Sequence, residues 1–333
     1  MSRLHAKQLR LLIAIEESGS LLGAADKVGL TQPGASKALR ELEQTFQVEL
    51  FARTNRGLIP NEAGKCVLRF ARLIQADINN LRFELEAIAS GAGGRLAIGT
   101  IMGAVPLLTD VISDLLQQQP RTTVEVVEDT SETLLDLVDR GRLDAAICRS
   151  SVSRTPDIYE SIFIKDESLS VIANVDHPAM GSESVELTDL QDSRWVVYRA
   201  HMPMRRLLER EFHEAQLNFP LHLVETTSTL TTLSLLSRNT DLVALVSDDV
   251  ANYFCRHHLV GVLPLHLKSR SEPYELVLRN GAPRSPTLNL LLESLNRVLT
   301  AGSCRSPLSL KQSTLINQQL KKLLPLRLES TCH

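Results

Sequence analysis

A polar stripe near the amino terminus carries the side-chain types that contact DNA. In the segment TQPGASKALREL, residues 31–42, the stripe recurs at i, i+4 spacing on one face of a predicted helix and consists of Gln32, Ser36, Lys37 and Arg40. Its amide, hydroxyl, ammonium and guanidinium groups can bond base edges and hold phosphates. Thr31 is expected to cap this helix. Pro33 fits its first turn, where a missing amide hydrogen costs little.

A second short helix must hold the stripe in place. Ser20 is a suitable N-cap, because its hydroxyl can accept an orphan amide of the first turn. Gly29 ends this helix, since glycine permits the left-handed geometry of a turn. The buried face between them recurs at helical spacing and consists of Leu21, Ala24, Ala25 and Val28. The alternative is an ordinary pair of helices with a solvated polar face.

Two flanking segments favour DNA binding over that alternative. The segment ELFARTNRGL predicts a small β-wing, in which Arg53 and Arg56 can touch the DNA backbone or a narrow minor groove. Asn61 is then expected to cap a helix that carries Glu62 in its first turn. About 28 residues give a helix of roughly 40 Å. Its apolar residues recur with a mean step of about 3.5, as in a coiled coil, and are Val67, Phe70, Ile74, Ile78, Leu81, Leu85 and Ile88.

Residues 4–90 resemble the amino-terminal part of LysR-type transcriptional regulators. The resemblance rests on LRLLIAIEESGSLLGAADKVGLTQPGASKALRELE, on the ELFARTNRG wing and on AGK at the start of the long helix. It implies a winged helix-turn-helix domain over 4–61 and a dimerisation helix over 62–90. The implied partners are double-stranded operator or promoter DNA and further copies of the chain, as homodimer or homotetramer, with RNA polymerase left open. The residues expected to touch DNA are Ser20, Thr31, Gln32, Pro33, Ser36, Lys37, Arg40, Arg53 and Arg56.

Charge and composition agree with this interpretation. A length of 333 residues predicts about two or three domains. Residues 1–95 carry 13 Lys and Arg against 10 Asp and Glu, whereas the remainder carries 23 against 29. Positive charge therefore lies where phosphates are expected, and its small size favours two copies acting together. The sequence shows no signal-peptide core, no apolar run of about 18 residues and no metal-like cysteine spacing. These absences predict a cytoplasmic protein without membrane, metal or cofactor.

Beyond residue 95 the sequence predicts an α/β fold. Strands alternate with helices after a GAGG hinge at 91–94, which favours mostly parallel sheets. Two such lobes joined by two crossovers resemble the type-2 periplasmic-binding-protein fold that LysR-type regulators use for effector binding. A tail at 303–333 lies outside the resemblance and is expected to be an amphipathic helix or partly disordered. The predicted boundaries are 95–300 for the effector domain, with lobe I at 95–164 and 268–300 and lobe II at 165–267.

An effector site is predicted between the lobes. Ligands of open α/β sheets bind beyond the carboxyl ends of strands, against helix amino termini. Hydroxyls, helix amides and up to two arginines favour a small polar or anionic metabolite. Each candidate also has a simpler interpretation. A hydroxyl can cap a helix, an arginine can be a surface charge or form an inter-lobe ion pair, and the histidine can be solvated. The candidates are Thr100, Ile101, Met102, Thr130, Ser131 and Arg149 from lobe I, and Arg199, His201, Thr226, Ser228, Thr229, Val246 and Ser247 from lobe II.

Three further expectations concern the kind of regulator. WVVYRAHMPMRRLLEREF, LVETTSTLTTLSLL and SDDVANYF resemble a LysR subgroup related to galactose-binding-protein regulators, whose members respond to sugars or aromatic acids. Arg199 stands where that subgroup has an uncharged residue, which argues against a neutral sugar. A redox sensor using Cys148 and Cys255 is the alternative, although their apolar surroundings favour inert thiols. An enzyme is not expected, since no nucleophile elbow, P-loop or paired carboxylates occur.

Overall fold

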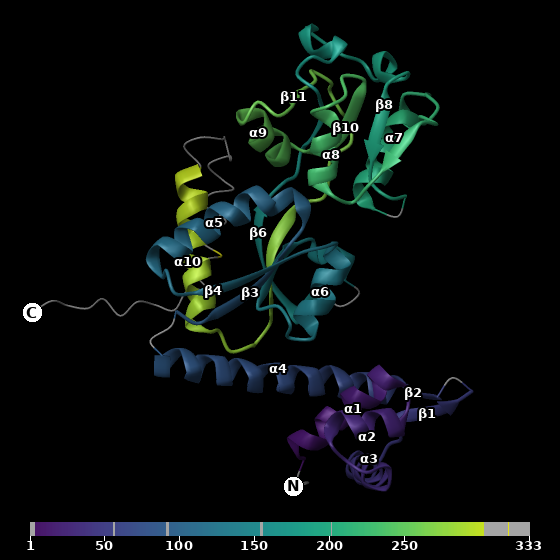
Figure 1. The fold of residues 1–333 in the computed structure, drawn as a ribbon, viewed down its shortest axis with the longest axis vertical. Coiled ribbons are helices and arrows are strands. Elements are labelled where there is room, and N and C mark those ends of the chain that lie inside the picture. Colours follow the sequence, from purple (N-terminus) through teal and green to yellow (C-terminus); the bar gives the residue numbers. More distant parts are fainter. Residues whose placement is uncertain are drawn as a thin grey trace, which may run out of the picture.

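The computed structural model describes residues 4–55, 57–90, 93–153, 156–200, 202–302 and 319. Figure 1 shows a small helical unit at one end of a long helix, α4, and two α/β lobes, the first beside α4 and the second beyond it. The predicted tail, apart from Gln319, lies outside the described residues. Among the helices of the described part, none has both the length and the apolar character needed to cross a bilayer.

The amino-terminal unit contains the predicted helix-turn-helix. Ser20 Oγ accepts the Gly23 amide at 3.1 Å, and Thr31 Oγ1 accepts the Gly34 amide at 3.3 Å. Gly29 ends the second helix with φ of +65°, so the predicted caps and turn are confirmed. The elements are α1 (Ala6–Ser18), α2 (Leu21–Val28), α3 (Gln32–Phe46), β1 (Phe51–Thr54) and β2 (Gly57–Pro60). They enclose a core that includes Leu12, Ile15, Ala24, Leu39 and Leu42.

The wing is fixed at its base by backbone contact with α1. β1 and β2 pair antiparallel, with Arg53 opposite Leu58. The Leu58 amide donates to the Gly19 carbonyl at 2.8 Å. Gly57 has φ of +107°, and a Cβ there would lie 2.3 Å from the same carbonyl oxygen. This position therefore requires glycine, and the wing keeps a fixed place relative to the helices.

Helix α4 (Glu62–Ser90) begins where the sequence predicts. Asn61 Oδ1 accepts the Gly64 amide at 2.8 Å, and its Nδ2 donates to the Glu49 carbonyl at 2.7 Å. A Cβ on Gly64 would lie 2.0 Å from the Leu50 carbonyl oxygen. The first turn of α4 is thus pressed against the chain that leads into the wing.

The middle of α4 contacts both of its neighbours. Arg72 forms an ion pair with Glu16 of α1, whereas Asp77 lies 3.1 Å from the guanidinium of Arg279, which belongs to the first lobe. Close by, a Cβ on Gly141 would approach the Ala76 Cβ to 2.5 Å. One stretch of α4 therefore joins the helical unit to the first lobe.

Lobe I is built on the sheet β4-β3-β5-β12-β6. β3 pairs in parallel with β4 and β5, whereas β12 pairs antiparallel with β5 and β6. The returning strand β12 enters from lobe II in the opposite direction, so the predicted mostly parallel sheet is instead mixed. The elements are β3 (Arg95–Thr100), η1 (Met102–Ala104), α5 (Val105–Gln118), β4 (Thr123–Glu128), α6 (Ser131–Asp139), β5 (Ala145–Cys148), η2 (Ser150–Val152), η3 (Pro156–Ile158), β6 (Tyr159–Lys165), β12 (Tyr274–Arg279) and α10 (Pro286–Gly302).

Lobe II is built on the sheet β11-β7-β10-β8-β9, which is mixed for the same reason, because β7 arrives from lobe I. Its core centres on Trp195, whose ring meets that of Phe212 edge-on at 5.5 Å. Figure 1 shows β8 with its arrowhead toward lobe I; β9 and β10 run parallel to β8, whereas β7 runs the opposite way. The elements are β7 (Leu169–Ala173), η4 (Pro178–Gly181), η5 (Leu187–Leu190), β8 (Arg194–Val197), α7 (Pro203–Glu214), β9 (Leu223–Glu225), α8 (Thr229–Leu236), β10 (Leu242–Ser247), α9 (Asp248–Arg256) and β11 (Gly261–Val262).

The close approach at Gly64 generates a stability prediction. Gly64→Ala should lower the free energy of unfolding by about 1–2 kcal/mol, because overpacking against a backbone carbonyl outweighs the better helix propensity of alanine. Chemical denaturation of both proteins measures the difference. Gly181→Ala is the matched control, since a Cβ there meets nothing within 4 Å. Equal or higher stability of Gly64→Ala would show that the start of α4 is not packed as described.

Candidate functional site

The exposed face of α3 carries the predicted DNA-contacting stripe. Gln32, Lys37 and Arg40 are exposed, and Ser36 is partly exposed. Arg40 Nη2 donates to Ser36 Oγ at 3.2 Å, and Lys37 Nζ lies 3.9 Å from a carboxylate oxygen of Glu41. Such exposed contacts contribute little, so both cations can exchange them for phosphate or base. The opposite face is buried through Ala35, Leu39 and Leu42.

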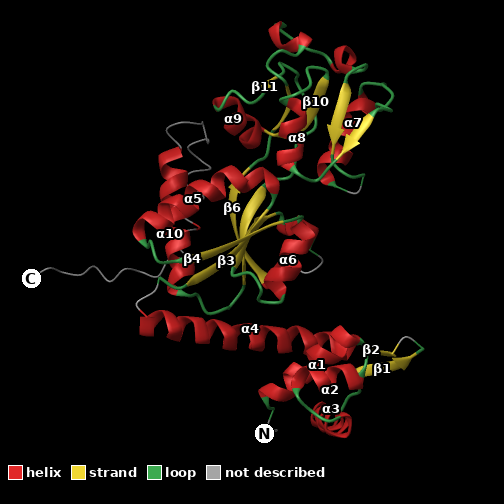
Figure 2. Ribbon diagram, viewed as in Figure 1, coloured by secondary structure: helices red, strands yellow, loops and turns green. Residues whose placement is uncertain are grey.

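The remaining predicted DNA contacts lie around this helix. Pro33 is exposed in the first turn of α3, and Arg53 is exposed on β1. Ser20 and Thr31 use their hydroxyls as caps, so they shape the helix starts. Arg56 lies outside the described residues. Figure 2 shows α3 on the side of α4 away from the lobes, which leaves its polar face open to a long partner such as a duplex.

The predicted coiled-coil seam forms an uncovered apolar stripe along α4. Val67 differs from the prediction, because it packs against the core of the amino-terminal unit. The other six side chains are between 39% and 79% exposed, and they are Phe70, Ile74, Ile78, Leu81, Leu85 and Ile88. A contiguous stripe of large apolar side chains is typical of a surface that binds a partner.

The lobe I side of the predicted effector site lies at the carboxyl ends of β3 and β4. Thr100 and Glu128 are direct partners in the parallel register. Thr130 caps α6 as predicted. The Ser131 hydroxyl accepts the backbone amide of Arg149 at 3.2 Å, which joins the start of α6 to the end of β5. Thr100 is fully buried, and its hydroxyl donates to the Ile101 carbonyl at 3.0 Å. This side therefore combines a helix amino terminus and one carboxylate with hydroxyls that already have backbone partners.

Tyr198 bridges the two lobes and is not among the residues that the sequence predicts for the site. Its hydroxyl donates to Met102 Sδ of lobe I at 2.8 Å. Burial raises its pKa above the usual range, and the carboxylates of Glu128 and Glu167 raise it further. The phenol therefore stays protonated and neutral. An aromatic hydroxyl at the end of the RWVVY strand was the available signal, but the prediction chose the neighbouring Arg199.

Arg149 is occupied at the hinge between the lobes. Its guanidinium pairs with Glu167 on the first connection, and donates to Ser271 Oγ at 2.9 Å and to the Glu272 carbonyl at 3.2 Å on the second. A Cβ on Gly103 would lie 2.1 Å from Glu167 Oε1, so the ion pair is packed against lobe I without room to spare. Arg149 therefore forms the inter-lobe ion pair that the sequence left as an alternative, and its guanidinium is not free to bind an effector as the sequence predicted.

A second polar cluster ties α9 to both connections. Lys165 Nζ lies 2.8 Å from Asp249 Oδ1, and the Tyr274 hydroxyl donates to Asp249 Oδ2 at 2.9 Å. Burial raises the pKa of Tyr274 well above its usual range, with the Asp249 carboxylate as a further cause. α9 also packs on η1 of lobe I. The hinge side of the cleft is therefore closed by paired charges.

The start of α8 supplies hydroxyls from lobe II. Ser228 Oγ accepts the Thr231 amide at 3.2 Å, and Thr226 Oγ1 accepts the Ser228 amide at 3.1 Å. Thr229 Oγ1 is buried, and it has no hydrogen-bond partner within the described part of the chain. These residues form a helix amino terminus beside which the Thr229 hydroxyl is buried and, among the described residues, unpaired.

The other candidates lie elsewhere. Ile101 and Val246 belong to the apolar cores of lobe I and lobe II, which corrects their assignment to the site. Ser247 is buried and caps α9. Arg199 is exposed, and His201 lies outside the described residues. Side chains at the end of a strand point alternately into the core and toward the ligand site. The rule that ligands bind beyond the carboxyl ends of strands does not tell these two faces apart.

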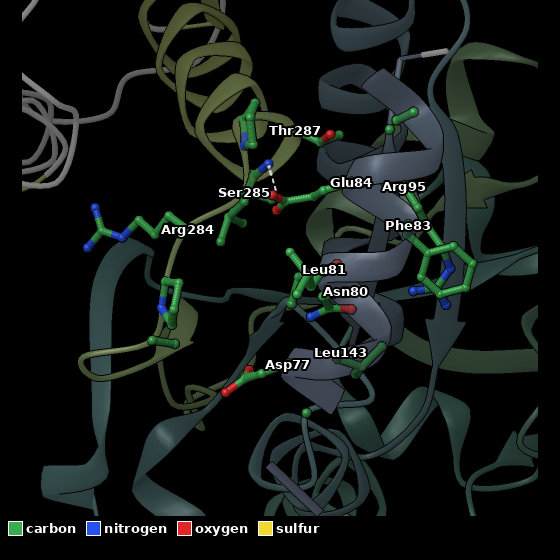
Figure 3. A pocket seen from close by; sticks show the side chains of 18 of the residues that line it. Asp77, Asn80, Leu81, Phe83, Glu84, Arg95, Leu143, Arg284, Ser285 and Thr287 are labelled. Atoms are coloured by element: carbon green, nitrogen blue, oxygen red, sulfur yellow. Dashed lines mark hydrogen bonds between the residues drawn. The ribbon is translucent and has the colours of Figure 1, made fainter. Parts of the chain in front are cut away.

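A pocket of about 600 Å³ lies between α4 and lobe I, well away from this cleft. Figure 3 shows Asn80 and Leu81 of α4 facing it, with Glu84 pointing toward Ser285. The pocket includes Arg95 at the beginning of β3, whereas the effector rule selects the other end of that strand. Leu81 also belongs to the exposed stripe, so a second helix on the stripe would border this pocket.

The two cysteines of the redox alternative lie in different lobes, and both thiols have raised pKa values. Cys148 is fully buried in the lobe I core, and burial raises the pKa of its thiol to about 12. Cys255 packs against the lobe II core, where burial also raises its thiol pKa. The thiolate is the reactive form, so these surroundings disfavour oxidation at either residue.

Comparison with known proteins gives two matching domain families. Residues 6–65 match "Bacterial regulatory helix-turn-helix protein, lysR family", and residues 89–300 match "LysR substrate binding domain". The regulator GbpR of Azospirillum brasilense is 29% identical over 296 residues, which cover 88% of this chain and 86% of GbpR. The regulator GalR of Pseudomonas putida is 28% identical over 301 residues, which cover 89% and 74%.

Solved structures share the fold. Full-length LysG of Corynebacterium glutamicum, solved with its bound effector Arg, has a TM-score of 0.60 at 16% identity, over 90% of this chain and 99% of that one. CbnR, a LysR family transcriptional regulator, has a TM-score of 0.58 at 20% identity, over 89% and 99%. At these identities the likeness concerns the architecture alone.

The stripe on α3 and the wing should contribute differently to DNA binding. Arg40→Ala should relax sequence choice and weaken specific binding by ~1–3 kcal/mol, because a bidentate base contact is lost. Arg53→Ala should weaken binding to all sequences and flatten its salt dependence. Titrations of specific and scrambled duplexes at several salt concentrations separate the two, with the exposed lobe II residue Arg238→Ala as control. Unchanged specificity in Arg40→Ala would mean that α3 is oriented differently.

The hinge ion pair should matter for stability. Arg149→Gln should lower the free energy of unfolding by about 3 kcal/mol, because it leaves the Glu167 carboxylate buried and unpaired. Arg140→Gln, which loses an exposed pair with Asp136, should change stability by less than about 1 kcal/mol. Denaturation curves measure both. A small effect at Arg149 would contradict its placement at the hinge.

Proposed function

This chain belongs to the LysR family of bacterial helix-turn-helix transcriptional regulators, and we propose that it binds a specific operator as a homodimer or homotetramer under control of a small metabolite. The family regulates transcription through a DNA-binding domain and an effector-binding domain, and its members are not enzymes. We place its action in the cytoplasm, where bacterial DNA lies, with RNA polymerase as a further candidate partner.

The observation that carries the proposal is the exposed polar face of α3 within the matched helix-turn-helix segment. Three of its long side chains are open to solvent, and their existing contacts are exposed and weak. One copy has a small positive charge over residues 1–95, so it would hold DNA weakly on its own. Two copies joined along α4 would present two such faces to two half-sites.

The metabolite is proposed to bind between the lobes, against the starts of α6 and α8. Closure would move lobe II toward lobe I. Lobe I in turn contacts α4, where Arg279 pairs with Asp77 and Gly141 lies close to Ala76. A ligand that binds the closed form better shifts the population toward it. The consequence for DNA is a change in the spacing of the two binding domains or in the bend of the duplex.

Random-oligonucleotide selection with the full chain tests the proposed function. At low ionic strength, with and without pools of small metabolites, selection should enrich a pair of related half-sites. Thr100→Ala or Ser228→Ala should retain that binding and lose its response to metabolites. Failure to enrich any sequence under all conditions would refute the proposal.

The exposed stripe on α4 leads to a prediction about assembly. Ile74→Asp should raise the dissociation constant of the dimer roughly a hundredfold or more, because two carboxylates would be buried in the seam. Sedimentation or light scattering over a dilution series measures it. Leu221→Asp is the control, since Leu221 is 92% exposed outside any helix or strand. If Ile74→Asp stays as dimeric as the control, the seam lies elsewhere.

The cysteine environments predict no redox response. Because burial raises the thiol pKa of Cys148 to about 12, its thiolate is scarce at neutral pH and is lost further as the pH falls. DNA affinity should therefore be the same with and without reductant, and after brief peroxide treatment. A change in affinity that Cys148→Ser or Cys255→Ser abolishes would establish the redox alternative instead.

A further inference from the structure

The buried arginines near the cleft are committed to protein carboxylates. Arg149 is held by Glu167 and by the second connection. Arg205, at the start of α7, is also buried, and its guanidinium donates to Glu209 at 2.7 Å and lies near Glu225 at 3.4 Å. It stacks over the Phe219 ring with 4.3 Å to the centroid. Neither guanidinium is available to an anionic ligand without breaking these contacts.

One carboxylate near the predicted effector site, that of Glu128, has no polar partner within the described part of the chain. Glu128 ends β4 beside Thr100. Partial burial raises its pKa. It lies near enough to the Tyr198 phenol to raise the phenol pKa as well. This edge of the cleft therefore offers hydrogen-bond acceptors and negative charge.

We propose that Glu128 and Tyr198 select an effector that donates hydrogen bonds through hydroxyl or ammonium groups and that is not an anion. The inference rests on the proposed function, and it narrows the class of effector in that same cleft. The Glu128 carboxylate accepts from the ligand, the Tyr198 oxygen accepts through its free lone pair, and Thr229 Oγ1 supplies a further buried hydroxyl.

This proposal reverses the preference for an anion that the sequence suggested. That preference depended on two arginines, of which Arg149 is occupied. The other, Arg199, is exposed, as Glu128 is, but the charges that raise the pKa of the Tyr198 phenol between the lobes are the Glu128 and Glu167 carboxylates. A carboxylate ligand would instead lose its own hydration beside a second carboxylate, which is unfavourable on both counts.

The test uses matched probes that share a skeleton and differ in one group. Glucosamine, glucose and glucuronate form one set; benzylamine, benzyl alcohol and benzoate form another; ethanolamine, ethylene glycol and glycolate form a third. The full chain is melted with each probe at millimolar concentration, because a ligand of the native state raises the melting temperature. In at least one set, the amine or the neutral member should stabilise the protein and the acid should not.

Two variants separate the proposal from its rival. Glu128→Gln should weaken binding of the stabilising amine or alcohol roughly tenfold, since a charge-assisted hydrogen bond is lost. Arg199→Gln should leave it unchanged. Stabilisation by the acid member that Arg199→Gln abolishes would overturn the proposal, and so would the absence of stabilisation by every amine and alcohol. Neither result changes the outcome of the oligonucleotide selection. The proposed effector class can therefore be wrong while the proposed sequence-specific DNA binding stands.

Discussion

The arrangement of the two lobes depends on one buried ion pair. Arg149 meets Glu167 at the place where the chain crosses between the lobes, and both side chains are almost wholly buried. Removing two charges from water is unfavourable unless further hydrogen bonds satisfy them. Ser271 and the Glu272 carbonyl supply these from the second crossing. The guanidinium thus joins both connections at one point.

Helix α4 converts the position of lobe I into the position of the DNA-binding unit. Its middle is tied to the unit through Arg72 and Glu16, and to lobe I through Asp77 and Arg279. Beyond those contacts a pocket separates the end of the helix from lobe I. The helix meets lobe I again at Phe83, whose ring lies 5.4 Å from the Arg95 guanidinium, so a rotation of lobe I would be passed to α4 along this part of its length. The exposed stripe would transmit that movement to a second copy.

The sequence predicted those features that depend on residues close together in the chain, such as the helix caps. Ser20, Thr31 and Asn61 cap their helices because the cap and the amide that it accepts are three residues apart. The partners of Arg149 could not be foreseen, since Ser271 lies 122 residues further along the chain. Val246 was misplaced because a fully buried strand gives no alternation to show which face meets the cleft. Tyr198 was missed since its phenol matters only through Met102 in the other lobe.

The charges of the two halves constrain how any effector signal can reach DNA. Residues 96–333 carry 29 acidic against 23 basic side chains, whereas residues 1–95 carry a positive excess. A phosphate backbone therefore attracts the helical unit and repels the lobes at close range, over a screening length of about 8–10 Å. This charge distribution disfavours direct contact between the lobes and the duplex. Under the proposed function, the effector would therefore act through the geometry of α4, and a ligand that closes the lobes without moving lobe I against α4 would bind without changing DNA binding.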